Sequence, residues 1–189
     1  KNHYVKVISS DFKNSQKKES KLSYEGFKEI NLFSKIFYIF FSFIKLRPIQ
    51  LGYFFSPKIK EYVQNNFQNY DLIFFQSFRT AQYMPKDNTK TYILDMGDLM
   101  SKNYKQTSVR YFFFNPIRII YYIESLLVKR YESFCFKKFT KILLHSKVEM
   151  DSVEKKFKRK LAQFSFGVTN INKKYSFHQK NYKIIFIGN

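Results

Sequence analysis

Side chains capable of acid–base chemistry stand where apolar runs of the chain end. Asp95 and Asp98 bracket the pair Met96-Gly97 at the end of the apolar run 91–95. Two carboxylates in such a position can receive the hydroxyl groups of a substrate, or one of them can act as a general base. The same carboxylates can instead cap the segment that follows, and the sequence leaves both roles open.

Three further residues at the ends of apolar runs also have two interpretations each. His145 is either a structural histidine or a base. Ser146 opens the pattern Ser-Lys-Val-Glu, which is typical of a capping box, so its hydroxyl is expected to satisfy helix amides unless it contacts a ligand. Arg79 is either a surface charge or a guanidinium suited to phosphate.

One carboxylate is expected inside an apolar helix face. At helical spacing, Glu124 shares a stripe with Ile117, Ile120, Leu127, Tyr131 and Phe134. A buried glutamate needs a partner or a proton. We expect a nearby Arg or Lys to supply that partner.

Short apolar runs and helical patterns alternate along the chain and must position these groups. The predicted strands cover residues 4–9, 70–76, 91–95, 140–145 and 162–166. The predicted helices cover residues 32–45, 57–68, 117–138 and 147–160. The polar residues 11–30 are expected to form a mobile surface loop.

The alternation indicates βαβ units and an α/β fold, with a Rossmann-like, doubly wound, mostly parallel sheet. Runs that are nearly continuous in apolar residues suit parallel strands covered on both faces. Ligands of such sheets bind beyond the carboxyl ends of the strands. The candidate site residues at those ends are Gln76, Arg79, Asp95, Asp98, His145, Ser146 and Gly167.

The composition is strongly basic and aromatic. The 189 residues carry a formal net charge of +20, and 21% of them are aromatic. Enrichment in Lys, Ile, Asn, Phe and Tyr is typical of an AT-rich coding bias, which we take as the main cause. A surface for anionic lipid is the next explanation, and nucleic acid is the weakest because no recognised binding motif occurs. A single Cys excludes a disulfide framework and suits a reducing, cytoplasmic compartment.

The apolar run 36–44 raises the question of a membrane. It is far shorter than the roughly 20 residues needed to span a bilayer. It predicts either an amphipathic helix packed on the sheet or an interfacial helix whose aromatic side chains enter the headgroup region. In the second case the membrane-contact residues are Lys35, Phe37, Phe40, Phe41 and Lys45.

Familiar catalytic motifs are absent from the sequence. It contains no GxGxxG, P-loop, HExxH, GxSxG or CxxC pattern, and the spacing of Asp95 and Asp98 differs from that of a DxD metal site. Hydride transfer, ATP hydrolysis and zinc chemistry therefore have no sequence support. We expect neither a metal nor a cofactor.

Both ends of the sequence look like cuts. The chain begins without Met, and it stops on the strand-like run 183–189. We expect it to be a piece of a longer protein.

Several stretches, taken in order, carry a family resemblance. They are 46–50, 53–57, 70–73 with Arg79 and Tyr83, 94–101 with Asn103 and Tyr104, Glu124 with 130–132, 141–146, 166–168 and 185–189. This order resembles the N-terminal, acceptor-side domain of family 4-like glycosyltransferases of the GT-B fold, especially transferases of exopolysaccharide pathways. One departure is Gln76, which stands where many members carry a His that contacts the donor sugar.

The resemblance implies a Rossmann-like domain over residues 1–180 and the start of a nucleotide-sugar-binding domain at residues 181–189. It implies a complete protein that transfers a sugar from a nucleotide sugar to a lipid-linked or polysaccharide acceptor, without metal, on the inner face of the plasma membrane. Asp98 would contact the acceptor hydroxyl or act as base, Gln76, Arg79 and Ser146 would line the acceptor side, and amides at helix starts would assist the diphosphate.

Two other classes of function stay open. One is an inactive remnant of a truncated gene. The other is a non-catalytic basic module that binds anionic membrane or nucleic acid, which predicts steeply salt-dependent binding.

Overall fold

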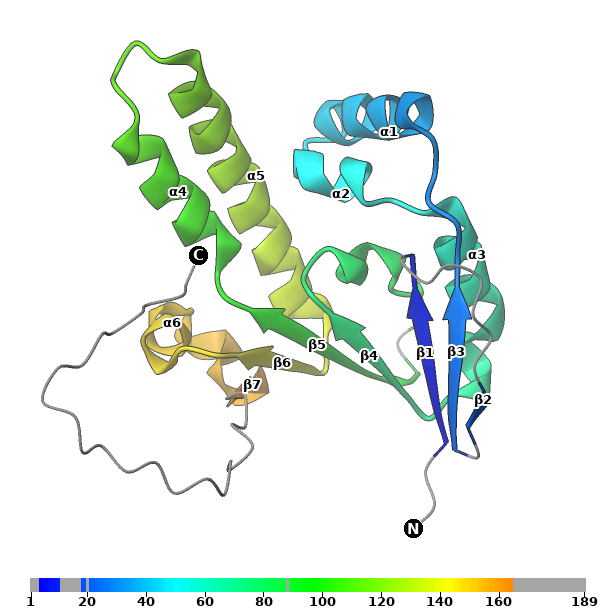
Figure 1. Ribbon diagram of the computed structural model, residues 1–189. Coiled ribbons are helices and arrows are strands. Elements are labelled where there is room, and N and C mark those ends of the chain that lie inside the picture. The colour runs from blue at the N-terminus through cyan, green and yellow to red at the C-terminus, as the bar shows by residue number, and fades with distance from the viewer. Residues whose placement is uncertain (1–3, 11–17, 20, 88, 165–189) are drawn as a thin grey trace, which may run out of the picture.

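The strands of the chain form two sheets. The structure is a computed structural model that describes residues 4–10, 18–19, 21–87 and 89–164 (Figure 1). The first sheet has the order β1-β3-β2, with β1 (Val5–Ser9), β3 (Leu22–Gly26) and β2 (Lys18–Glu19). The second has the order β4-β5-β6-β7, with β4 (Leu72–Gln76), β5 (Thr91–Gly97), β6 (Lys141–Leu144) and β7 (Leu161–Gln163).

Every strand pair in the second sheet is parallel. β4, β5 and β6 coincide with three of the predicted apolar runs, and β1 coincides with a fourth. β7 overlaps the predicted run 162–166 at residues 162–163, and residues 165–166 lie outside the described residues. The α/β class with parallel strands is therefore confirmed, and the two sheets are compatible with a Rossmann-like fold. They are nevertheless two sheets rather than the single sheet that was predicted.

The expectation of a surface loop over residues 11–30 is wrong where the structure describes β3. This strand pairs in parallel with β1 and antiparallel with β2. Its apolar residues Leu22 and Tyr24 alternate with polar ones, which is a strand pattern that the polar composition of the region conceals. An ion pair of 2.6 Å between Lys6 and Glu25 joins β1 to β3.

The helices connect and cover the strands. The α-helices are α1 (Leu32–Ile44), α2 (Ile49–Tyr53), α3 (Pro57–Asn66), α4 (Met100–Arg110), α5 (Pro116–Lys138) and α6 (Lys147–Ser152). The 3-10 helices are η1 (Phe67–Asn69), η2 (Thr80–Tyr83) and η3 (Lys155–Lys160). Helices α1, α3 and α5 confirm the prediction, whereas the predicted helix 147–160 is divided into α6 and η3. Helix α4 was missed because its sequence has no apolar stripe.

Helices α4 and α5 form a long hairpin whose far end projects beyond the sheets (Figure 1). The buried residues of α5 begin at Glu124, so the turns before it extend past the core. Below that point Val128 packs with the fully buried sheet residues Leu94, Ile142 and Leu144. The root of the hairpin is therefore anchored in the core, and its far end is exposed.

Helix α1 packs on α2, and not on the sheet as one of the two predictions had it (Figure 1). The contact is close because Gly52 has no side chain: a Cβ atom there would lie 2.3 Å from the carbonyl oxygen of Tyr38. The Tyr38 ring also packs edge-on against Phe55, with 4.7 Å between the ring centroids. Helix α1 is thus a second layer that is separated from the sheets by α2.

Candidate functional site

The end of β5 brings Asp95 and His145 together. The Asp95 carboxylate is buried, and its Oδ1 accepts a hydrogen bond of 3.1 Å from the Gly97 amide. The same oxygen lies 3.7 Å from Nε2 of His145, at the end of β6. Gly97 has a φ of +71°, which favours glycine, and its carbonyl accepts from the His145 amide at 2.8 Å. Asp95 therefore both stabilises its own turn and faces an imidazole.

Asp98 and Gln76 lie close to this pair in the chain and the sheet, but they are exposed. Gln76 is the register partner of Asp95, while Asp98 follows the turn at Gly97. Within the described part of the chain, Asp98 has neither a hydrogen bond nor an ion pair to another residue. Its carboxylate is available to a ligand at the carboxyl edge of the sheet.

Ser146 forms the helix cap that the sequence predicts. Its hydroxyl accepts from the Glu149 amide at 3.4 Å at the start of α6. Glu149 reaches instead to the β5–α4 connection, where its carboxylate accepts from the Leu99 amide at 3.1 Å. The position of Ser146 is thus explained by capping.

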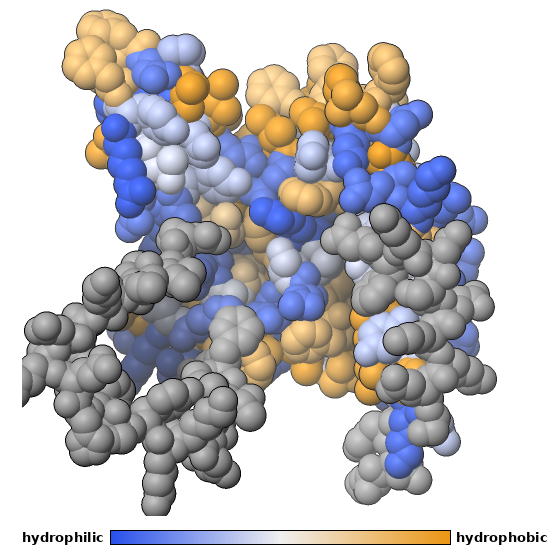
Figure 2. Space-filling model, in the orientation of Figure 1, coloured by the Kyte–Doolittle hydropathy of each residue, from blue (hydrophilic) through white to orange (hydrophobic). Residues whose placement is uncertain are grey.

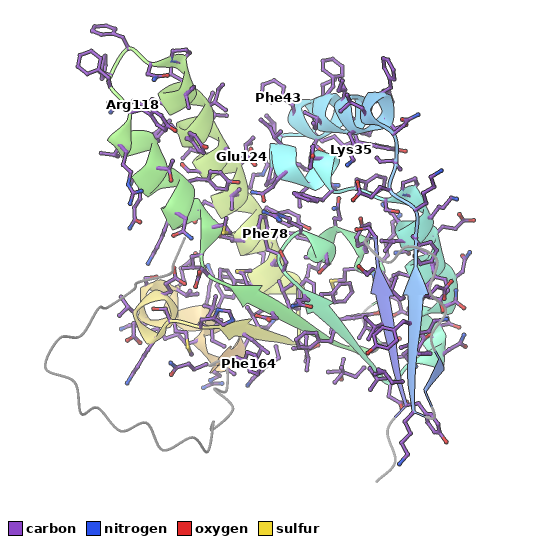
Figure 3. All side chains as sticks on the ribbon, viewed as in Figure 1. Lys35, Phe43, Phe78, Arg118, Glu124 and Phe164 are labelled. Carbon is purple, nitrogen blue, oxygen red and sulfur yellow. The ribbon has the colours of Figure 1, made fainter. Side chains whose placement is uncertain are left out.

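A second polar cluster joins α2, α4, α5 and the turn after β4. Glu124 accepts hydrogen bonds from the amides of Ile49 (2.9 Å) and Gln50 (3.5 Å) at the start of α2 (Figure 3). The Gln50 side chain donates to the Tyr104 hydroxyl at 3.0 Å and accepts from Nε of Arg79 at 2.7 Å. The partner of Glu124 is therefore backbone, and the expectation of an Arg or Lys partner is wrong.

Arg79 is held in place by two neighbours. Besides its hydrogen bond to Gln50, its guanidinium lies over the Phe54 ring, 4.4 Å from the centroid. Such stacking is a common role of Arg. It places Arg79 in the second cluster rather than beside Asp95 and His145.

A third glutamate occupies the start of α4. Glu132, on α5, accepts from the Ser101 amide at 2.9 Å and from the Ser101 hydroxyl at 2.6 Å. Together with Glu124 and Glu149 it binds amides at the beginnings of α2 and α4, where the helix dipole favours negative charge. The expectation that helix-start amides serve a diphosphate is not met at these two helices, because the protein's own carboxylates occupy them.

Burial raises the pKa of two of these glutamates. Desolvation is the main cause for Glu124 and for Glu132, and the donated hydrogen bonds partly oppose it by favouring the carboxylate. Both side chains are almost fully buried. They are structural groups that connect helices.

The sequence-predicted residues therefore separate into groups. Asp95, Asp98, His145 and Gln76 belong to the carboxyl edge of β4, β5 and β6, whereas Arg79 belongs to the second cluster. Gly167 and the segment 181–189 lie outside the described residues. Sequence reasoning overlooked Gln50 and Glu132 as bonding groups, and only the helical spacing of Glu132 from Glu124 and Val128 could have indicated its burial.

Helix α1 exposes its apolar face to solvent, whereas an ordinary surface helix buries that face. At 3.6 residues per turn, its exposed apolar residues cover one half of the helix. This outer face of α1 consists of Leu32, Phe33, Ile36, Phe37, Phe40, Phe41, Phe43 and Ile44. The half that faces α2 carries the less exposed Ser34, Lys35, Tyr38, Ile39 and Ser42. The apolar half of α1 thus faces away from the protein.

The five predicted membrane-contact residues divide accordingly. Phe37, Phe40 and Phe41 lie on the outer face, and Lys45 is exposed just after it. Lys35 lies on the other side, where it pairs with Glu29 at 2.7 Å and stands over the Tyr53 ring at 4.9 Å (Figure 3). The assignment of Lys35 to a membrane surface is therefore corrected, because its charge is already neutralised within the protein.

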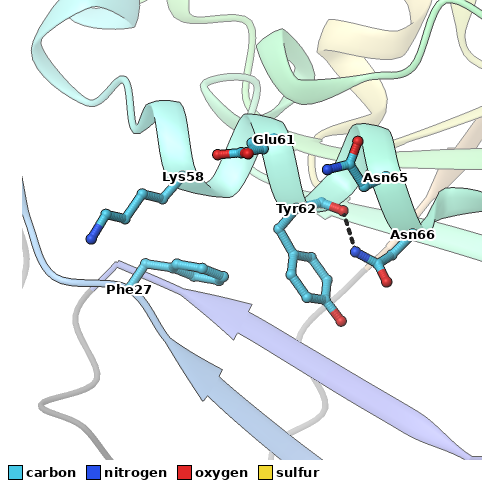
Figure 4. A pocket seen from close by; sticks show the side chains of 6 residues that line it. All are labelled: Phe27, Lys58, Glu61, Tyr62, Asn65 and Asn66. Carbon is cyan, nitrogen blue, oxygen red and sulfur yellow. Dashed lines mark hydrogen bonds between the residues drawn. The ribbon is translucent and has the colours of Figure 1, made fainter.

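A separate hollow of about 340 Å³ lies on α3 (Figure 4). It is lined by Phe27, Lys58, Glu61, Tyr62, Asn65 and Asn66. None of the sequence-predicted site residues contributes to it. Among the described residues there is also no group of three His, Cys, Asp or Glu side chains arranged as metal ligands.

Comparison with known proteins gives no relative. No family description, curated protein or solved structure matches the chain. Across the described residues, no helix is both long enough and apolar enough to cross a membrane.

Proposed function

We propose that the chain is the acceptor-side half of a glycosyltransferase that transfers a sugar from a nucleotide sugar to a lipid-linked or polysaccharide acceptor. The observation that carries the proposal is the carboxyl edge of β4, β5 and β6. There Asp95 lies 3.7 Å from His145, and the exposed Asp98 follows Asp95 by three residues in the chain. This is the edge at which open parallel sheets bind ligands.

The chemistry assigned to this edge is general base catalysis. The acceptor hydroxyl forms the new bond to the anomeric carbon of the donor sugar, and the bond to the diphosphate breaks. The hydroxyl proton passes to Asp98, and the departing diphosphate takes the electron pair. His145, which faces Asp95, and the nearby Gln76 would hydrogen-bond sugar hydroxyls.

The proposal includes a donor-binding half that lies beyond the described residues. In a two-half enzyme, the developing charge on the diphosphate is stabilised by preorganised donors that include groups of that half. The amides at the starts of α2 and α4 take no part, since Glu124, Glu132 and Glu149 occupy them. The proposal also includes a cytoplasmic location next to the membrane, where an acceptor carried on a lipid would be reached.

The first test is donor binding by the complete protein. Calorimetric titration with UDP-, GDP- and CMP-linked sugars should give saturable binding of one of them. With that donor, Asp98→Ala should lower turnover by about 10²- to 10⁴-fold. The matched control is Asp71→Ala. Asp71 is also exposed, but it precedes β4 and so lies at the amino ends of the parallel strands. Absence of binding across the panel, or equal turnover of the two variants, would contradict the proposal.

A second candidate function is a non-catalytic module that binds an anionic membrane. The outward-facing apolar half of α1 favours it. This candidate predicts vesicle binding without any affinity for nucleotide sugars. Donor titration and vesicle sedimentation of the same preparation therefore distinguish the two.

A further inference from the structure

The end of the α4–α5 hairpin is a second exposed apolar surface. The connection between the two helices contains Phe112, Phe113 and Phe114, which we call the hairpin tip. Their side chains are 77%, 67% and 81% exposed. Adjacent turns of α5 add Ile119 and Ile120, which are also more than half exposed. Single exposed apolar residues are ordinary, but a contiguous group marks an interaction site.

The tip is exposed because no other described part of the protein packs against it. The first buried residue of α5 is Glu124, so no core lies under the preceding turns. The aromatic rings contact one another instead: Phe113 and Phe114 pack edge-on, with centroids 5.3 Å apart. The Arg118 guanidinium stands over the Phe113 ring at 5.1 Å, which places a cation directly beside the apolar tip (Figure 3).

The outer face of α1 lies at the same end of the molecule as the hairpin tip. Figure 2 shows hydrophobic residues along the upper rim in two places, one at the end of the hairpin and one over α1. The two are connected at their base, because Glu124 of α5 binds the start of α2, on which α1 packs. The Glu124 hydrogen bonds therefore link the helix that carries the hairpin tip to the helix on which α1 packs.

Charge determines which partner suits these surfaces. Residues 30–60, which contain α1, include no Asp or Glu, and neither do residues 99–123, which contain α4 and the hairpin tip. Apart from Lys35, which is paired with Glu29, the basic residues next to the two apolar surfaces are Lys45 and Arg47 after α1 and Arg110 and Arg118 on either side of the hairpin tip. Exposed aromatic side chains beside an excess of positive charge complement the interface of an anionic bilayer. An apolar protein partner would not require the absence of carboxylates.

We infer that the hairpin tip and the outer face of α1 insert together into one leaflet of an anionic membrane. The protein is attached at two points, with the Glu124–Gln50–Tyr104 contacts between them. This two-point attachment goes beyond the proposed transferase activity and does not depend on it. It adds a contact element that differs in sequence and in position from α1.

The chain contains no Trp, so a single introduced Trp is a clean reporter of insertion. Phe113→Trp and Phe40→Trp report on the hairpin tip and on α1. Phe134→Trp is the matched control, since Phe134 is an exposed aromatic residue on the same helix, α5, but within the body of the protein. Vesicles of equal parts phosphatidylglycerol and phosphatidylcholine, with bromine in the acyl chains, should quench both reporters and leave the control unquenched.

Loss of the tip should weaken binding without unfolding the chain. Phe112→Ser, Phe113→Ser and Phe114→Ser combined should lower the vesicle partition coefficient at least about tenfold. Binding of the unsubstituted chain should also fall as salt is raised, and it should be weak on pure phosphatidylcholine. Because these side chains are exposed and their ring contacts within the described residues are with one another and with Arg118, the thermal midpoint should stay the same, which separates a binding defect from misfolding.

Two results would overturn the inference. In the first, Phe40→Trp is quenched while Phe113→Trp is not, so α1 alone meets the membrane. In the second, the emission of Phe113→Trp shifts to the blue without vesicles as protein concentration rises, and sedimentation shows a dimer, so that a second copy covers the tip. Neither result bears on nucleotide-sugar binding, which tests the proposed function separately.

Discussion

The body of the protein and its two projecting surfaces partition residues in opposite ways. The body buries carboxylates such as Glu124 and Glu132, which are only 5% and 4% exposed. The outer face of α1 and the hairpin tip expose phenylalanines, including Phe33 at 85% and Phe114 at 81%. Each region thus reverses the usual preference for apolar residues inside and charged residues outside.

The buried carboxylates and the exposed phenylalanines differ in whether contacts within the chain offset their unusual placement. Each buried carboxylate accepts hydrogen bonds from named amides, so the fold itself accounts for its burial. The exposed phenylalanines gain little from the fold, because their apolar area stays in contact with water. A buried carboxylate whose hydrogen bonds are made within the chain has a structural role. Apolar side chains that the chain leaves exposed indicate an external partner.

The largest expected effect tests the contrast between core and surface directly. Leu94→Ala, in the middle of β5 and fully buried, should lower the free energy of unfolding by about 2–5 kcal/mol. Phe33→Ala removes a larger side chain from α1, but it should change the free energy of unfolding by less than about 0.5 kcal/mol. Urea unfolding of the two variants measures the difference. Comparable losses would mean that the outer face of α1 is covered in solution.

The next effect concerns the attachment of α1. Gly52→Ala should cost about 1–3 kcal/mol, because the new Cβ meets backbone atoms of Tyr38 and Ile39 that cannot move aside without shifting α1. Trypsin should then cleave faster after Lys35 and Lys45 than in the unsubstituted chain. Ser42→Ala, on the inner half of the same helix, is the control and should leave the cleavage rate unchanged. Unaltered proteolysis of Gly52→Ala would show that α1 does not depend on this contact.

A smaller loss is expected at the turn after β5. Gly97→Ala should destabilise the protein by about 1–2 kcal/mol, since alanine is strained at a φ of +71°. The new Cβ would lie 3.5 Å from Cε1 of His145, an ordinary contact, so backbone strain is the whole effect. Gly97→Asn should lose less, because asparagine tolerates this conformation better. Equal losses from both substitutions, measured by thermal unfolding, would assign the effect to side-chain volume instead.

The smallest effect is a pH dependence of stability. The pKa of Glu132 is raised by burial, so the folded state holds the proton more tightly than the unfolded chain does. Its contribution is fully present below the unfolded pKa and is lost as pH rises through the folded pKa. Glu132→Gln should therefore gain stability relative to the unsubstituted chain as pH rises across that interval. Urea midpoints over a pH series measure this.

A surface glutamate provides the comparison for that series. Glu154→Gln changes an exposed carboxylate, so its urea midpoint should follow that of the unsubstituted chain at every pH. If Glu132→Gln shows the same parallel behaviour, the buried carboxylate does not control the pH response.

Local patterns were enough to predict most elements of the parallel sheet. The apolar runs that became β4, β5 and β6 are short and nearly continuous, and strands of that kind can be recognised without their neighbours. The cap at Ser146 was likewise predicted, because hydroxyl and amide are three residues apart. Helix α4 was missed because its sequence has no apolar stripe, and strand β3 was missed because the polar composition of its region conceals its alternation.

The candidate edge was predicted in part. Asp95, Asp98 and His145 stand at the carboxyl ends of strands predicted to be parallel, so their position at one end of the sheet could be anticipated. The grouping of Arg79 with Gln50 and Phe54 could not, because it depends on how α2 is placed over the turn after β4.

The sequence by itself was enough to predict the parallel strands of this protein and the acid–base groups at their carboxyl ends. Local spacing and the chemistry of individual residues are enough for such conclusions. Only the tertiary structure decided that Glu124 and Glu132 bind backbone amides and that the phenylalanines of α1 face outward. A helical pattern shows that one face is apolar, but which side is buried depends on what packs against the helix. Here α2 packs on the polar side, and that contact leaves the apolar side of α1 exposed together with the hairpin tip.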